Sequence, residues 1–234
     1  MEHETVLRPS EGALTLAEHM IERGDVMSDI LNETIQSAKA GRIKEAGRTF
    51  CPGGGEVRGP LKRYPRAVDL ASCPVSRGGT FHTHVTADEL LHPENSLPDM
   101  ANVVYGLTDV SAVVGTRSMD MVLAPKEDQA EDAVARFENA IGESISGPRE
   151  LHNAITSGRI RPTTARKRAR EALGDLVHTV ETGFPEIEAE LDAVQMESVA
   201  EPMMSGKLES FTGPTTPMGF SSTSIEEAAE NATE

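Results

Sequence analysis

Two histidines, a serine and an aspartate lie close together in the sequence. His82 and His84 are separated by one residue, and Ser96 and Asp99 follow shortly after them. If residues 80–85 form a β-strand, side chains alternate between its faces, so both imidazoles project from the same side. Two imidazole nitrogens and one carboxylate oxygen, with a water in the fourth position, form the open tetrahedral arrangement of a catalytic zinc. We therefore predict that His82, His84 and Asp99 bind Zn²⁺.

A hydrolase built on this site needs two further groups. Zinc lowers the pKa of a bound water to roughly 7, which makes a hydroxide available at neutral pH. A carboxylate must accept the proton of that water, and a hydroxyl such as that of Ser96 can donate to the oxyanion. The carboxylate candidates are Glu56, Asp88, Glu89 and Glu94. We favour Glu56 as the base, because it follows a triple glycine and leads into an extended segment from which it can point inward.

The order of these residues resembles the JAMM motif of catalytic MPN-domain metalloproteases, in which a glutamate precedes His-x-His and Ser-x-x-Asp. The corresponding stretches are EVRGPL from Glu56, HTH from His82 and SLPD from Ser96. In that family the two histidines and the aspartate hold zinc, the glutamate is the acid/base, and the serine helps to stabilise the oxyanion. The resemblance therefore implies that His82, His84 and Asp99 hold zinc. It also implies that Glu56 is the acid/base and that Ser96 stabilises the oxyanion.

The chain departs from the family between the second histidine and the serine. Eleven residues separate His84 from Ser96, more than is usual in the family, and Val85 stands where a proline commonly follows. Lengthening a loop costs only about 0.6 kcal/mol per doubling, so the fold can absorb the insertion. We expect residues 86–94 to border the cleft and to influence substrate specificity.

Hydrophobic periodicity predicts an α/β (α+β) fold. Apolar residues at helical spacing predict one helix over 14–40, or two helices joined near Gly24. Alternating apolar segments predict strands at 67–75, 80–85, 110–115 and 118–124. The family resemblance implies an MPN/JAMM-like curved mixed sheet flanked by helices.

Four regions follow from these patterns. Residues 1–13 are predicted to form an N-terminal arm, and 14–125 the JAMM/MPN-like domain. Residues 126–200 are predicted to form a helical extension, with one helix over 163–181 and no further strand. Residues 201–234 are rich in Ser, Thr, Gly, Pro and Glu, which is typical of a low-complexity tail.

The chain is strongly acidic. Its 38 Asp and Glu outnumber its 22 Lys and Arg, for a formal net charge of -16 over 234 residues. Such a charge opposes binding to nucleic acids and anionic membranes. It is typical of a halophilic protein, and an ordinary acidic bacterial protein is the alternative. No apolar run approaches the roughly 18 residues of a membrane span, so we expect a cytoplasmic protein without one. The basic cluster at 159–170 is interpreted either as a solvated helix face or as a docking site for an acidic partner or nucleic acid.

Two cysteines, Cys51 and Cys73, lie 22 positions apart. This spacing is neither that of a zinc knuckle nor that of a disulfide framework. Buried free thiols are the favoured interpretation, and a single disulfide or an accessory metal ligand are the alternatives.

The predicted function is that of a zinc-dependent peptidase or isopeptidase, in which a metal-activated water hydrolyses an amide bond. The resemblance suggests a protein or peptide substrate, such as a lysine conjugate of a ubiquitin-like modifier. The alternative is a structural component of a larger particle, such as a virion head or tail, built on an MPN-like scaffold with or without maturation protease activity. In that case the helical extension and the tail would mediate homo- or hetero-oligomerisation.

Overall fold

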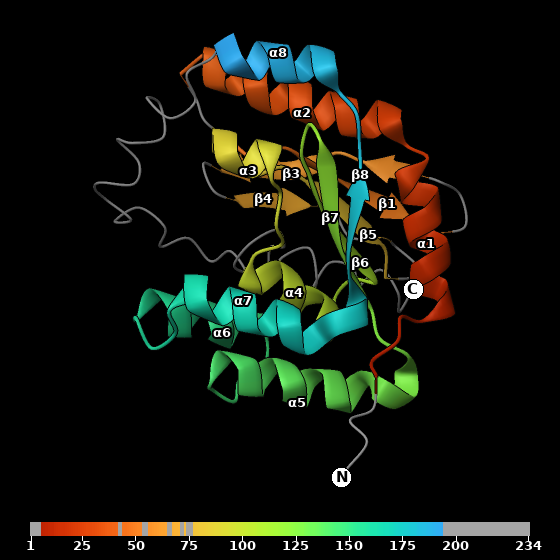
Figure 1. The fold of residues 1–234 in the computed structure, drawn as a ribbon, viewed down its shortest axis with the longest axis vertical. Coiled ribbons are helices and arrows are strands. Elements are labelled where there is room, and N and C mark those ends of the chain that lie inside the picture. The colour runs from red at the N-terminus through yellow and green to blue at the C-terminus, as the bar shows by residue number, and fades with distance from the viewer. Residues whose placement is uncertain are drawn as a thin grey trace, which may run out of the picture.

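The computed structural model describes residues 6–41, 44–52, 56–64, 67–70, 73 and 77–193. Within these residues the chain forms a six-stranded mixed sheet with helices against both faces (Figure 1). In sheet order, the strands are β2 (Glu56–Arg58), β1 (Gly47–Cys51), β5 (Gly79–His82), β6 (Val110–Val114), β7 (Ser118–Leu123) and β8 (Val177–Glu181). Strands β5 and β6 run parallel, and the other neighbouring strands are antiparallel. The predicted α/β class, with a mixed sheet flanked by helices, is confirmed.

Helices α1 (Glu11–Ile21) and α2 (Gly24–Lys39) cover one face of this sheet (Figure 1). The second of the two predicted arrangements, two helices joined near Gly24, is therefore correct. Apolar residues of α2 recur every three or four positions, which places them on one side of the helix. The buried apolar residues of α2 are Val26, Met27, Ile30, Leu31, Ile35 and Ala38. Helix α8 (Pro185–Ala193) packs alongside α2.

Helix α4 (Leu97–Val104) packs against β6 and β7 on the opposite face. Outside it lie α5 (Ala130–Ile141), α6 (Pro148–Thr156) and α7 (Pro162–Leu173), so every residue of α4 is buried. The short helix α3 (Ala87–Leu91) lies between β5 and α4 in the chain. Among the helices that the structure describes, none has the length and apolar character needed to cross a membrane.

The predicted helix over 163–181 is wrong in its second half. Helix α7 ends at Leu173, and Gly174 adopts a positive φ of 50°, which favours glycine and stops the helix. Strand β8 follows and pairs with β7 over its whole length. Three of its five residues, Val177, Thr179 and Val180, are β-branched, which suits a strand. The sheet therefore continues beyond the region predicted to contain it, and residues 126–193 are not purely helical.

The part of the N-terminal arm that is described lies against the end of β7. The backbone N–H of Ser10 donates to the carbonyl oxygen of Ala124 at 2.9 Å, and Leu7 is buried. Residues 6–10 are therefore attached to the fold. The tail at 201–234 lies outside the described residues. The division of the chain into four regions, made from the sequence, stays a prediction.

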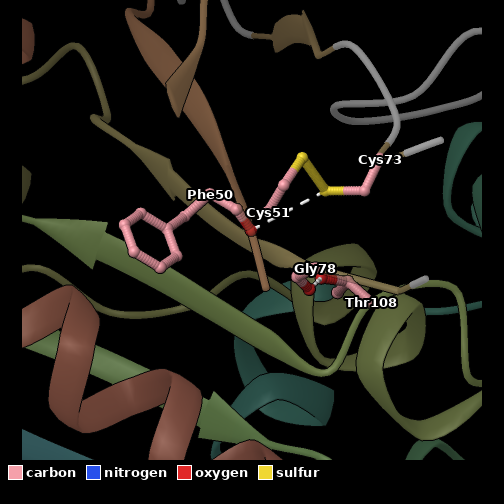
Figure 2. Close-up of a disulfide and its surroundings, with 5 residues drawn as sticks. All are labelled: Phe50, Cys51, Cys73, Gly78 and Thr108. Carbon is pink, nitrogen blue, oxygen red and sulfur yellow. Dashed lines mark hydrogen bonds between the residues drawn. A yellow bond between two sulfur atoms is a disulfide. The ribbon is translucent and has the colours of Figure 1, made fainter. Parts of the chain in front are cut away.

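A disulfide joins Cys51, at the end of β1, to Cys73 (Figure 2). The two cysteines are 22 positions apart, and the bridged segment contains a separate two-stranded sheet of β3 (Pro60–Tyr64) and β4 (Ala67–Leu70). Cys73 Sγ lies 3.8 Å from the carbonyl oxygen of Phe50. This is a van der Waals contact, because a disulfide sulfur carries no hydrogen to donate. The favoured prediction of free thiols is wrong, and the alternative of a single disulfide is confirmed.

Gly78 leads into β5 and passes close to the disulfide (Figure 2). A Cβ at this position would lie 2.6 Å from Cys73 Sγ and 2.6 Å from the carbonyl oxygen of Phe50. The hydroxyl of Thr108 donates to the carbonyl oxygen of Gly78. Only a glycine allows β1, the disulfide and the start of β5 to approach this closely.

Replacing both Cys51 and Cys73 with serine should lower the free energy of unfolding by about 3 kcal/mol, because the loop would no longer be closed in the unfolded chain. Chemical denaturation of the parent and the double variant, both without reductant, measures the difference. As a control, reduced parent protein should match the double variant. Two thiols that react readily in the unreduced parent would contradict the disulfide.

Candidate metal centre

His82 is the last residue of β5, and His84, two residues further on, projects to the same side of the sheet. Strand pairing places His82 opposite Gly47 of β1, and the backbone N–H of Thr83 donates to the carbonyl oxygen of Ala46 at 2.9 Å. This bond continues the pairing beyond the end of β5, so His84 is held as if it were still in the strand. The two imidazole centroids are 5.4 Å apart. The predicted alternation of side chains is therefore confirmed.

Thr83, between the two histidines, points to the other face. Its hydroxyl oxygen lies 2.6 Å from that of Thr34 on α2, and it accepts a hydrogen bond from the backbone N–H of Ala46 at 3.1 Å. Both threonines are fully buried. This contact holds the histidine segment against α2, on one face of the sheet. Both imidazoles therefore lie on the opposite face, the side of α4.

Asp99 comes from the first turn of α4 and meets both histidines. Its Oδ1 is 3.3 Å from His82 Nε2, and its Oδ2 is 3.7 Å from His84 Nε2. One potential ligand atom of each residue lies within 4.8 Å of the other two, and all three residues are buried. The structure therefore brings the three predicted ligands together as a group that could hold a metal ion.

Ser96 is the N-cap of α4 and orients Asp99. The hydroxyl of Ser96 donates to Asp99 Oδ2 at 2.6 Å, and its backbone N–H donates to the same oxygen at 2.7 Å. The backbone N–H of Asp99 returns a weaker bond to the Ser96 hydroxyl at 3.4 Å. This capping box directs the carboxylate toward the histidines. The predicted role of Ser96 as an oxyanion donor is not tested by this arrangement and stays a prediction.

The charges around His84 favour its protonated form in the metal-free protein. Burial alone lowers the pKa of His84, but Asp99, Glu45 and Glu89 together outweigh burial and raise it to about 9. For Asp99 burial has the opposite effect and raises the pKa, but His82 and His84 outweigh it and hold the pKa of Asp99 well below its usual range. Asp99 is therefore an anion at any ordinary pH and can bind a cation.

Glu89, one of the carboxylates considered as a base, lies near the Nδ1 atom of His84. Its Oε1 is 3.7 Å from His84 Nδ1, too long for a hydrogen bond but close enough for attraction. Thr86 and Glu89 form the capping box of α3, which holds the carboxylate in place. Asp88 is exposed, and Glu94 forms an ion pair with Arg166 of α7 at 3.0 Å. The short helix thus places one acid next to the metal centre.

Glu45 is the residue that sequence reasoning missed. Glu45 is buried. Gly47 pairs with His82, Glu45 lies two residues before Gly47, and His84 lies two residues after His82. The antiparallel register therefore sets Glu45 opposite His84, consistent with its effect on the pKa of that histidine. Only knowledge of which strands pair could have revealed it.

Glu56, the predicted base, lies on β2 and pairs with Cys51. Cys51 is four residues along β1 from Gly47, the residue that pairs with His82. Glu56 is therefore displaced from His82 by about 13 Å along the strand direction, on a strand that is separated from β5 by β1. The side chain of Glu56 lies outside what the structure describes, so its role stays a prediction.

The site should bind one divalent cation per chain, with His82→Ala lowering the affinity by at least about 100-fold. Losing a direct ligand should exceed the 10–100-fold effect typical of outer-shell residues. Metal analysis after equilibrium dialysis measures both quantities. The matched control is His178→Ala, because this exposed histidine lies on β8. Equal binding by the parent and His82→Ala would contradict the assignment.

The affinity for the cation should rise with pH up to about pH 9. At neutral pH, His84 of the metal-free protein carries a proton that the cation must displace, because its pKa is about 9. Falling pH therefore weakens binding, and binding near neutral pH releases a proton. Calorimetric titration in buffers of different ionisation enthalpy detects this release. An affinity that stays constant between about pH 6 and pH 9 would contradict the raised pKa.

Comparison with known proteins leaves this geometry as the basis for assigning a function. No protein-family model, curated protein or solved structure matches the chain.

Proposed function

We propose that the protein is a zinc-dependent amide hydrolase, a peptidase or isopeptidase, with His82, His84 and Asp99 as metal ligands. The observation that carries this proposal is the convergence of the three buried side chains, with ligand atoms within 4.8 Å of one another. Two imidazoles and one carboxylate are a donor set of catalytic rather than structural zinc sites, since a position stays open. A bound zinc ion would supply an activated water and polarise the substrate carbonyl.

We propose Glu45 as the group that accepts and returns the proton. It is buried and close enough to His84 to raise the pKa of that histidine. A carboxylate in this position can take a proton from the attacking water and pass it to the leaving amine. The JAMM-like motif then begins at Glu45 rather than at Glu56, while its histidines, serine and aspartate keep their assignments.

The surrounding fold supports this proposal. A mixed sheet with one histidine strand, and a helix whose first turn carries the serine and the aspartate, agrees with what the resemblance to the MPN-domain metalloproteases implies. Glu89 would keep His84 in the orientation in which Nε2 faces the metal, as outer-shell carboxylates do in many metal sites. The segment 86–94 borders the centre through this contact, which supports its proposed influence on substrate choice.

The substrate class follows only from the resemblance. We propose a protein or peptide amide bond, including a lysine conjugate of a ubiquitin-like modifier. The alternative of an assembly component was suggested by the helical extension, the basic cluster and the tail at 201–234, and it stays a prediction.

A matched pair of variants tests the proposal. Glu45→Gln should bind zinc yet lose amide hydrolysis by at least about 100-fold, because general bases contribute 10²–10⁴-fold to such reactions. Glu56→Gln should keep both zinc and activity. The measurement uses zinc-loaded protein with a library of quenched peptides and a lysine-isopeptide conjugate, and activity should disappear on chelation and return with zinc.

The possible outcomes separate the parts of the proposal. If Glu56→Gln loses activity and Glu45→Gln does not, the assignment of the base is wrong but the hydrolase is not. If zinc-loaded parent protein cleaves no amide substrate of either kind, the hydrolase proposal is rejected and the site is left as a metal-binding one.

A further inference from the structure

A buried ion pair connects α7 to the sheet. Asp120 of β7 is completely buried, and both of its carboxylate oxygens accept hydrogen bonds from the guanidinium of Arg170. The hydroxyl of Thr179 on β8 adds a longer bond to the carboxylate at 3.4 Å. An unpaired carboxylate at this position would be strongly destabilising, because breaking a buried pair leaves a charge without water or a counterion. Arg170 therefore compensates the buried carboxylate of Asp120 through two hydrogen bonds.

The same carboxylate holds the segment that leads to the metal ligand. The backbone N–H of Asn95 donates to Asp120 Oδ2 at 2.7 Å. The side-chain amide of Asn95 donates to Oδ2 at 3.0 Å and to the backbone carbonyl oxygen of Asp120 at 2.8 Å. Asn95 is completely buried and directly precedes Ser96, whose hydroxyl and N–H orient Asp99.

A second contact from α7 meets the neighbouring residue. Arg166 lies one turn before Arg170 on the helix, and its guanidinium is 3.0 Å from the carboxylate of Glu94. Two arginines four positions apart thus hold two consecutive residues, Glu94 directly and Asn95 through Asp120. Both arginines belong to the basic cluster at 159–170, so part of this cluster makes contacts within the fold.

We propose that α7 is part of the metal centre, and that Arg170 and Asp120 are positioning residues for the ligand Asp99. Their influence passes through Asn95 and Ser96 and sets where the Asp99 carboxylate meets the two histidines. This inference rests on the proposed metal site. It means that the helical segment after residue 126 completes the site instead of merely extending the domain.

Substituted cobalt(II) protein tests the proposal, because the visible absorption of cobalt reports the geometry of its ligands. Arg170→Lys keeps the positive charge but cannot donate to both oxygens with a planar fork. Asp120→Asn removes the charge and replaces one acceptor with a donor. Both variants should bind cobalt about tenfold more weakly than the parent and show an altered cobalt spectrum, as expected when an outer-shell partner is lost.

The control is Arg136→Lys. Arg136 also pairs with an aspartate of the helical segment, Asp132, within α5. It should match the parent in affinity and spectrum. Thermal unfolding of each metal-free variant shows whether it is folded, and Asn95→Ala, which keeps the buried ion pair intact, replaces any variant that is not. Asn95→Ala should change affinity and spectrum in the same direction.

The results decide between the inference and the function on which it rests. Folded variants that bind cobalt with the parent's affinity and spectrum overturn the positioning role and leave the metal site standing. A parent chain that binds no cobalt overturns the metal site, and the inference with it. Loss of affinity in Arg136→Lys to the same extent would show a general effect of weakened packing and would also overturn the positioning role.

Discussion

The burial of the Asp99 carboxylate between two imidazoles is the interaction on which the rest of the site depends. A carboxylate removed from water is costly unless other groups compensate for the lost hydration. Ser96 donates two hydrogen bonds to it, and the N-terminal end of α4 adds a favourable dipole. With Glu45 and Glu89 close to His84, three carboxylates surround two imidazoles. This excess of negative charge favours a divalent cation.

The geometry of the centre is held from three directions. From one face of the sheet, α2 reaches Thr83 through Thr34 and fixes the histidine strand. Strand β1 pairs with β5 beyond its end and brings Glu45 opposite His84. From the other face, α7 holds the approach to Ser96. Elements of the sheet and of both helical layers, distant in sequence, thus contact one small site.

Local patterns predicted much of the fold. Alternation over 110–115 and 118–124 predicted β6 and β7, and helical periodicity with a possible break at Gly24 predicted α1 and α2. The prediction failed at 163–181, where the helix ends at Leu173 and a short edge strand follows from Val177. Whether such a segment is helix or strand depends on an available sheet edge, and the local sequence does not reveal that edge.

The sequence by itself identified the three residues that could hold a metal ion, because they lie near one another in the chain. A strand places alternate residues His82 and His84 on one side, and a helix cap places Asp99 next to Ser96. Only the tertiary structure decided which distant groups join them. Glu45 reaches His84 through antiparallel pairing, and Arg170 reaches the ligand segment through Asp120. Strand register and helix packing decide which distant residues come into contact. The positions of these residues in the sequence do not indicate that they will meet.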